Sequence, residues 1–174
     1  MTAVDEAFMA EALAEARRSV ELGEFPVGAV VALDGQIVVR AHWAGAAQRR
    51  LLDHPEMLAL MEAERGGKVS SRQERQAATL YTTLEPCALC MGAAMSFLLG
   101  RLVFAADAPV DGAGNLPTLW QPHNGHPQDG MPYTIPEVVG GVGREASIAL
   151  IAEWVQRNPE QTWAAGYLPA GVFH

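Results

Sequence analysis

The stretch Pro86-Cys87-Ala88-Leu89-Cys90, read together with His54-Pro55-Glu56 upstream, organises this chain. The sequence contains only 2 cysteines, and both lie in that pentapeptide. Cysteines three residues apart at the start of a helix place two sulfur atoms on one face of the helix. With the imidazole of His54 they supply three corners of a tetrahedral zinc site, and a catalytic zinc keeps the fourth corner for water. Glu56 is then a carboxylate near that water, available to move protons.

Two other interpretations of the C-x-x-C pair remain open. The pair resembles the redox motif of thioredoxin-like proteins, and it also resembles half of a structural zinc site built from four cysteines. The four-cysteine site needs further cysteines, which the sequence lacks. A redox pair commonly follows a strand and opens a helix, as this one is predicted to do, so its local context does not exclude it. The His-Pro-Glu element favours the catalytic zinc site.

The bulk properties limit the class of protein. The 174 residues suit one compact domain, so residues 1–174 are expected to form a single domain. We find no apolar run of membrane-spanning length and no secretory pattern at the N-terminus. Two cysteines give no disulfide framework, which favours a cytoplasmic location. The formal net charge of −8 repels a phosphate backbone, so neither nucleic acid nor a membrane is the expected partner.

Hydrophobic periodicity predicts alternating helices and strands. Apolar residues recur at helical spacing in the first segment, where Thr2 and Asp5 form a capping box, and Asp34-Gly35 is a hairpin signal between the first two strands. Helices are predicted over 2–22, 53–65, 86–99 and 144–156, and strands over 27–33, 37–41, 78–83, 101–106 and 138–139. Residues 68–76 are expected to form a loop. This order predicts an α/β fold, a three-layer α/β/α sandwich with a mixed five-stranded sheet.

Three features outside the regular elements bear on a site. Gly28, inside a strand, is expected either to let a flat ligand approach the backbone or to form a bulge. The Pro/Gly-rich segment 107–136 is expected to line a pocket, and its His123 and His126 are a weaker candidate for a second metal site. The tail 157–174 carries Trp163, Tyr167 and Phe173, aromatic residues that need a surface to cover: their own active site as a lid, a partner subunit, or the core.

The motifs resemble a known family. His54-Pro55-Glu56, Thr83–Cys90 and the Phe25–Val30 strand resemble the cytidine deaminase-like superfamily, whose zinc deaminases carry an H-x-E…P-C-x-x-C signature. Within it, the chain is similar to bacterial guanine deaminases and tRNA adenosine deaminases. The resemblance implies a cytidine deaminase-like fold, one Zn²⁺ per subunit and a homodimer.

The resemblance also implies roles for single residues. His54, Cys87 and Cys90 would bind the metal, and Glu56 would be the catalytic proton shuttle. Asp111 falls where guanine deaminases place an aspartate that contacts the substrate. The relatives usually have an asparagine shortly after the second strand, and here the comparable positions are Trp43 and Ala44. Trp43 is therefore expected to stack on the substrate, and Phe25 either to stack on it or to pack in the core.

The reaction expected is hydrolytic removal of an exocyclic amine from a small nitrogen heterocycle, with release of ammonia. Free nucleobases such as guanine or cytosine, and aminated triazines, all carry an amine on an electrophilic carbon next to a ring nitrogen. The first alternative is a tRNA adenosine deaminase, which must take its base out of the stack. The second is a non-catalytic zinc module or a redox module. The acidic balance and the tail from Asn158 to His174, which has no lysine or arginine, favour the small-molecule substrate.

Overall fold

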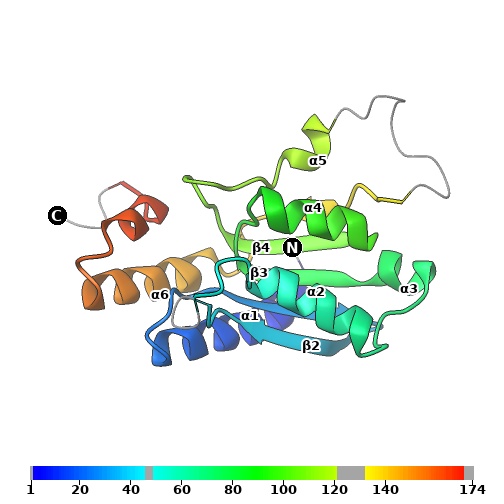
Figure 1. Cartoon of the computed structure of the whole chain (residues 1–174), viewed down its shortest axis with the longest axis horizontal. Coiled ribbons are helices and arrows are strands. Elements are labelled where there is room, and N and C mark those ends of the chain that lie inside the picture. Colours follow the sequence, from blue (N-terminus) through cyan, green and yellow to red (C-terminus); the bar gives the residue numbers. More distant parts are fainter. Residues whose placement is uncertain (1, 46–48, 121–131, 171–174) are drawn as a thin grey trace.

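A mixed five-stranded sheet forms the centre of the computed structural model, which describes residues 2–45, 49–120 and 132–170 (Figure 1). Its strand order is β2-β1-β3-β4-β5. β1 pairs antiparallel with β2 and β3, whereas β3–β4 and β4–β5 are parallel pairs. The strands are β1 Gly28–Leu33, β2 Gln36–His42, β3 Thr79–Leu84, β4 Arg101–Ala106 and β5 Glu137–Val139. The predicted mixed sheet of five strands is confirmed.

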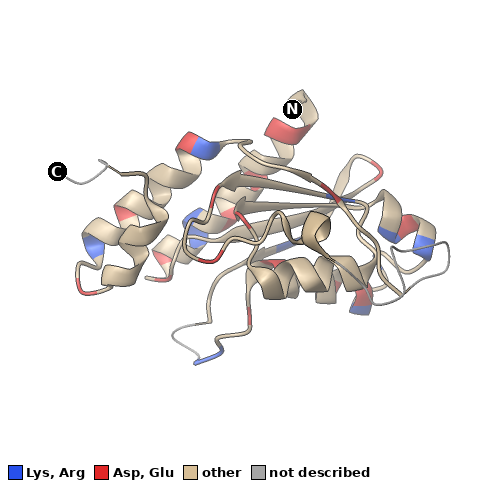
Figure 2. Cartoon of the chain, turned by 90° about the horizontal axis from the view of Figure 1, so that it is seen from above, with Lys and Arg blue, Asp and Glu red and all other residues tan. Residues whose placement is uncertain are grey.

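Helices cover both faces of the sheet, so the predicted α/β/α layering is confirmed (Figure 2). One face packs against α1 and α6, and the other against α2 and α4. Three short helices lie outside these layers. The bounds are α1 Ala3–Glu21, α2 Pro55–Arg65, α3 Arg72–Ala77, α4 Ala88–Phe97, α5 Leu116–Leu119, α6 Arg144–Arg157 and the 3₁₀ helix η1 Thr162–Tyr167.

Alternation along the strands produces the two faces of the sheet. In β1, Val30 belongs to the buried cluster under α1, whereas its neighbour Val31 belongs to the cluster under α2 and α4. Tyr81 and Leu80 of β3 divide in the same way. Because successive side chains of a strand point to opposite faces, a strand buried on both sides reads as a continuous apolar run. That run is what the sequence shows over residues 27–33.

Gly28 serves helix packing, so both expectations for it were wrong. A Cβ atom at this position would lie 2.2 Å from the carbonyl oxygen of Ala12 and 2.3 Å from the amide nitrogen of Ala16, both in α1. The irregularity in strand pairing lies elsewhere, between Val31 and Ala32. The missing side chain therefore lets α1 lie directly on the sheet, because any Cβ would push the helix away.

Several element boundaries differ from the prediction. The predicted capping box of Thr2 and Asp5 is present at the start of α1. Val4, one of the apolar residues at helical spacing in this segment, is 56% exposed and does not face the sheet. The segment expected to be a loop contains α3, which Ser71 and Glu74 cap in the same manner. Helix α4 ends at Leu98, whose φ of 70° is left-handed, and not at Gly100. Helix α2 begins at Pro55, two residues later than the predicted helix over 53–65.

The two remaining irregular segments are described in part. His123 and His126, the candidates for a second metal site, lie outside the described residues, and so does Phe173. The part of the tail that is described forms η1, in which Trp163 and Tyr167 pack against Phe25. Within the described ranges no helix combines the length and the apolar character needed to cross a bilayer.

Candidate active site

Two helix N-termini meet at the end of the sheet where β3 and β4 finish. His54 is the N-cap residue of α2, and Cys87 is the N-cap residue of α4, with Cys90 in the first turn. No side chain caps either helix end through a hydrogen bond. The free amide groups of a helix start carry partial positive charge, which favours thiolate over thiol. The two helix starts that carry the candidate ligands therefore lie at one place.

The three candidate ligand atoms form a compact triangle. The Sγ atoms of Cys87 and Cys90 lie 3.7 Å apart, and the Nδ1 atom of His54 lies 3.7 Å from the first sulfur and 3.4 Å from the second. A tetrahedral zinc with bonds of about 2.3 Å to sulfur and about 2.0 Å to nitrogen has edges of about 3.5–3.8 Å. The triangle thus has the dimensions of one face of such a tetrahedron. Among the described residues, this is the group of three or more His, Cys, Asp or Glu side chains that can hold a metal ion.

The charges of the triangle also suit a cation. The hydrogen-bond contact between the sulfur atoms of Cys87 and Cys90, together with the contact to His54, lowers the pKa of Cys87 to about 3. The same contact and burial raise the pKa of Cys90. Hydrogen bonding to Cys87 raises the pKa of His54. The lowered pKa of Cys87 favours its thiolate, and a bound cation would favour loss of the proton of Cys90.

Glu56 lies beside the triangle and is only 3% exposed. Its Oε1 atom accepts a hydrogen bond of 2.9 Å from the hydroxyl of Thr82, and its Oε2 atom lies 3.6 Å from the sulfur of Cys90. Burial raises the pKa of the Glu56 carboxyl, because the charged form loses hydration. A carboxyl with a raised pKa, held next to a metal triangle, is suited to accept and return a proton near neutral pH.

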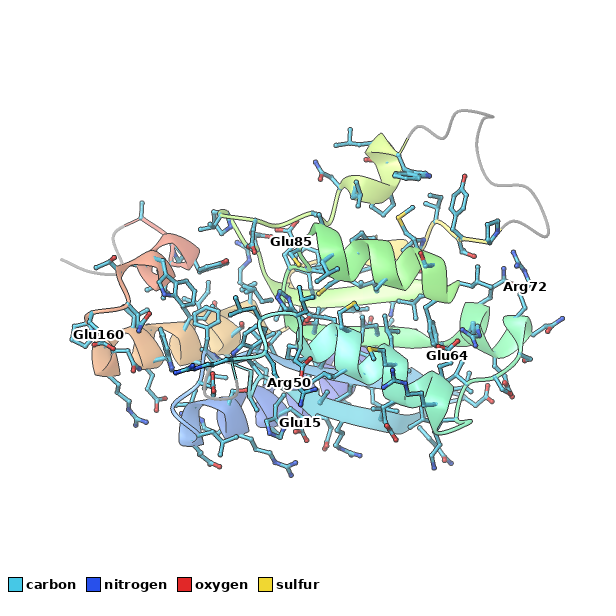
Figure 3. All side chains as sticks on the ribbon, viewed as in Figure 1. Glu15, Arg50, Glu64, Arg72, Glu85 and Glu160 are labelled. Carbon is cyan, nitrogen blue, oxygen red and sulfur yellow. The ribbon has the colours of Figure 1, made fainter. Side chains whose placement is uncertain are left out.

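Glu85 joins the segment before Cys87 to the loop after β4, a role that was not predicted from the sequence. Its carboxylate accepts hydrogen bonds from the backbone amides of Ala108 at 3.0 Å and Gly114 at 2.9 Å. Cys87 forms an isolated bridge with Gly112 in the same loop. Figure 3 shows Glu85 just ahead of α4. The signal was present in the sequence as a carboxylate before Pro86, but its partners lie far along the chain.

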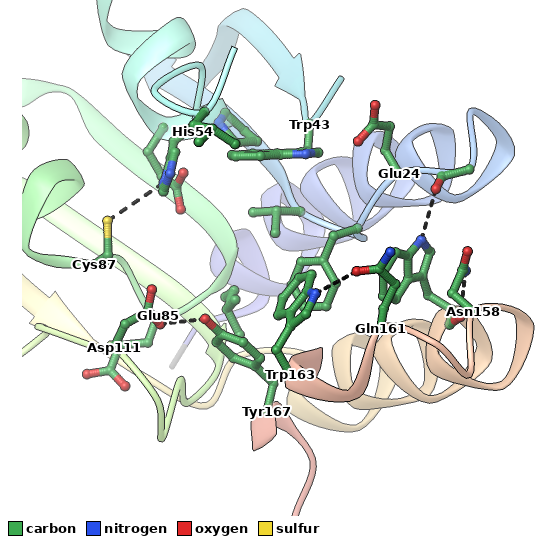
Figure 4. A pocket seen from close by; sticks show the side chains of 18 residues that line it. Glu24, Trp43, His54, Glu85, Cys87, Asp111, Asn158, Gln161, Trp163 and Tyr167 are labelled. Carbon is green, nitrogen blue, oxygen red and sulfur yellow. Dashed lines mark hydrogen bonds between the residues drawn. The ribbon is translucent and has the colours of Figure 1, made fainter. Parts of the chain in front are cut away.

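A pocket of about 460 Å³ opens next to the metal triangle (Figure 4). All three predicted substrate-binding residues, Phe25, Trp43 and Asp111, line it, as do His54 and Glu56. The ring of Trp43 stands edge-on to that of His54, with ring centroids 4.9 Å apart. The structure therefore brings together the candidate metal, catalytic and substrate-binding residues, and Trp43 occupies one wall of the pocket.

The pocket lining also includes Glu24 and Trp154, which were not predicted as site residues, and the tail aromatics Trp163 and Tyr167. The last two belong to η1, which lies against the pocket of its own chain. The hydroxyl of Tyr167 donates a hydrogen bond of 2.8 Å to Oδ1 of Asp111 and so joins the tail to the loop after β4. The aromatic content of the tail was the only sequence signal for this contact.

Comparisons with known proteins agree with this geometry. Residues 2–106 match the family model described as the cytidine and deoxycytidylate deaminase zinc-binding region. A tRNA-specific adenosine deaminase of Bacillus subtilis is 39% identical over 162 residues, which cover 92% of this chain and 94% of that protein. A structure from a study of tRNA:A34 deaminases has a TM-score of 0.66 at 34% identity, covering 83% of this chain and 98% of that one.

A guanine deaminase from Nitrosomonas europaea shares the fold, with a TM-score of 0.65 at 23% identity over 86% of this chain and 83% of that one. The family match covers residues 2–106, which contain the metal triangle and Glu56. The chain therefore belongs to the cytidine and deoxycytidylate deaminase zinc-binding family, and it is a zinc-binding hydrolytic deaminase.

Proposed function

We propose that this deaminase removes an exocyclic amino group from a small nitrogen heterocycle, such as guanine, cytosine or an aminated triazine, and releases ammonia. His54, Cys87 and Cys90 bind one zinc ion, and Glu56 is the catalytic acid and base. The observation that carries the proposal is the buried Glu56 carboxyl, which lies 3.6 Å from a sulfur of the ligand triangle and opens onto the pocket.

Glu56 performs both proton transfers of the hydrolysis. Zinc, when bound to the triangle, supplies Lewis-acid activation of water. The Glu56 carboxylate accepts a proton from the water as its oxygen adds to the carbon that bears the amine, and it delivers this proton to the neighbouring ring nitrogen. It then carries the second proton to the amine, which leaves as ammonia while the carbon keeps the oxygen. General acid–base catalysis of this kind contributes about 10²–10⁴-fold.

The other pocket residues position the ring. Trp43 and Phe25 present aromatic surface to a planar heterocycle, and Asp111 supplies a hydrogen-bond acceptor. A volume of about 460 Å³ lies within the range of small-ligand pockets. Trp43 takes the place of the carboxamide expected after β2, so recognition here relies on stacking and on the carboxylates.

The second candidate is an adenosine deaminase that acts on tRNA. The Bacillus subtilis relative and the tRNA:A34 deaminase structure support it, and the comparisons favour it over a free heterocycle. The charge of this chain supports the small substrate instead. The formal net charge is −8, and no Lys or Arg occurs among the residues that line the described pocket. A phosphate backbone therefore gains no ion pair with a lysine or arginine from the residues that line the described pocket.

The test combines metal analysis with ammonia release. We expect one zinc per chain, ammonia release from a panel of free bases and triazines, and slower release from nucleosides and from tRNA. Glu56→Ala should keep the zinc and lose turnover. Retained turnover in Glu56→Ala would remove the mechanism, and salt-sensitive tRNA binding with faster deamination of tRNA would select the second candidate.

A redox module, the remaining alternative, would show a reversible Cys87–Cys90 disulfide without stoichiometric zinc. The homodimer that the family resemblance implies stays a prediction, which sedimentation of the zinc-loaded protein tests.

A further inference from the structure

The pocket extends beyond the metal triangle and Glu56, towards the tail. We call Glu24, Phe25, Trp43, Trp154, Trp163 and Tyr167 the outer pocket. In Figure 4, Glu24 lies near Trp43 at the end of the pocket remote from Cys87. A heterocycle whose amine reaches the metal triangle therefore directs its far side towards these residues.

Aromatic faces make up most of the outer pocket. The ring centroid of Phe25 lies 5.3 Å from that of Trp154, 5.0 Å from Trp163 and 5.4 Å from Tyr167. The indole N–H of Trp154 donates a hydrogen bond of 3.2 Å to the carbonyl of Gly23. The indole N–H of Trp163 donates one of 2.8 Å to the side chain of Gln161. What the two tryptophans offer a ligand is therefore ring surface. Such faces carry negative partial charge and attract cations.

Apart from the candidate metal ligands, the charged side chains that line the pocket are all acidic. Its lining contains four carboxyl groups, those of Glu24, Glu56, Glu85 and Asp111, and no lysine or arginine among the described residues. Glu85 is held by two backbone amides and Glu56 lies beside the metal triangle. Asp111 accepts a hydrogen bond from Tyr167, and Glu24, which lines the outer pocket, is only 5% exposed. A carboxylate removed from bulk water interacts more strongly with a nearby charge than one at the surface.

We propose that the outer pocket binds a positively charged group on the substrate, on the side remote from the amine that is lost, and that it disfavours phosphate there. The inference rests on the proposed deamination and names the class of substrate: a cationic, phosphate-free heteroaromatic amine. Ring faces and the Glu24 carboxylate stabilise the cation together, whereas a phosphate meets carboxylates and no basic side chain.

A series of compounds with one reacting ring tests the proposal. 5′-Amino-5′-deoxyadenosine, adenosine and adenosine 5′-monophosphate carry an ammonium, a neutral hydroxyl and a phosphate at the same position, and the matching cytidine series varies the ring. We expect kcat/KM of the ammonium compound to exceed that of the neutral parent by about 10-fold, or about 1.4 kcal/mol. The phosphate compound should fall below the parent by about as much, and added salt should reduce both differences.

Two variants with matched controls locate the effect. Glu24→Gln should reduce the ratio between the ammonium and neutral compounds several-fold, whereas Glu160→Gln, which removes an exposed charge in the tail, should leave the ratio unchanged. Trp163→Leu should reduce the same ratio, because it removes an aromatic ring from the outer pocket at a residue that is 51% exposed. Trp120→Leu, an exposed tryptophan outside the pocket, is its control.

The outcomes separate this inference from the proposed function. Equal rates across the series, or a preference for phosphate, would overturn the inference while leaving the deaminase intact. If no compound released ammonia, the proposed function would fail. Calorimetric titration of the zinc-loaded protein with the ammonium and neutral compounds would still test the outer pocket. Equal affinities would overturn the inference there too.

Discussion

The hydroxyl of Thr82 is one of the groups that oppose the effect of burial on the catalytic carboxyl. Glu56 is almost fully buried, which raises its pKa, and the hydrogen bond from Thr82 acts in the opposite direction by stabilising the carboxylate. A general base works best when its pKa lies near the working pH. Burial alone would favour the protonated form, which cannot accept a proton from water. The Thr82 hydroxyl therefore favours the carboxylate, which is the form that starts the reaction.

Thr82→Val should move the acidic limb of the pH–rate profile to higher pH. The Thr82 hydroxyl lowers the pKa of Glu56, so its removal raises that pKa, and a higher pH is needed to ionise the carboxyl. A lost hydrogen bond to a charged group costs about 1.5–3 kcal/mol, which corresponds to about 1–2 pH units.

The profile of kcat between pH 5 and 9 measures this shift. Thr82→Ser, which retains the hydroxyl, is the control and should keep the original profile. Zinc content should be unchanged in both variants. A profile that shifts equally in both, or in neither, would show that the hydroxyl does not tune Glu56.

The distance along the chain between a site residue and its partners explains which site residues could be predicted from the sequence. His54, Glu56, Cys87 and Cys90 lie in two short motifs whose spacing alone indicates their chemistry. Glu85 and Tyr167 act through partners 23 and 56 residues away, at Ala108 and Asp111. No local spacing connects such pairs, so only the folded chain reveals them.

At the scale of elements, the strands and helices that could be predicted are those whose buried side gives the sequence a periodic pattern of apolar residues. Strands β1, β3 and β4 are almost wholly buried because the sheet is covered on both faces there, and the positions of all five strands agree with the sequence. Helix α3 has no buried residue, so hydrophobic periodicity carried no signal for it. Its Ser71 and Glu74 capping box was the signal available. The end of α4 at Leu98 was missed because a left-handed residue other than glycine or asparagine is uncommon there.

Gly28→Ala should separate α1 from the sheet and destabilise the protein. The new Cβ would meet backbone atoms of Ala12 and Ala16 at 2.2 and 2.3 Å, and backbone cannot move aside as a flexible side chain can. Overpacking of this kind costs about 1–3 kcal/mol, occasionally more.

Gly92→Ala, in α4, is the matched control, because its Cβ would meet nothing within 4 Å. It should raise the free energy of unfolding by up to about 1 kcal/mol through helix propensity. Urea denaturation of the zinc-loaded variants measures both changes. Equal stability of the two would contradict the packing role of Gly28.

At the scale of the whole molecule, residues far apart in sequence complete both the pocket and the core. The segment before β1 and the 3₁₀ helix η1 supply opposite ends of the chain to one pocket. The contact of Phe25 with Trp163 and Tyr167 could not be predicted. The tail has aromatic residues, but its sequence has no periodicity that indicates the surface on which they pack. At the other end of the sheet, Asp5 of α1 accepts hydrogen bonds from Tyr81 of β3 and Arg101 of β4. Arg101 also pairs with Glu137 of β5.

This buried cluster should make stability depend on pH. Arg101, 2.6 Å from the carboxylate, holds the pKa of Asp5 well below its usual range. A depressed carboxyl pKa contributes stability that is fully present above the unfolded value of about 3.9 and is lost as pH falls below it towards the folded value. Asp5→Asn should therefore cost about 1–3 kcal/mol at pH 7, and the gap to the parent protein should narrow from about pH 4.5 downward.

Urea denaturation of the zinc-loaded proteins at pH 7, 5, 4 and 3 measures that gap. Acid also protonates the metal ligands, but it does so in the parent and the variant alike, so the difference between them isolates Asp5. Glu6→Gln, which removes an exposed carboxylate from the same helical turn, should show no such gap at any pH. A gap that stayed constant from pH 7 to pH 3 would mean that Asp5 stabilises the fold by packing and not by its charge. The ionic connection between α1 and the parallel strands would then carry no part of the stability.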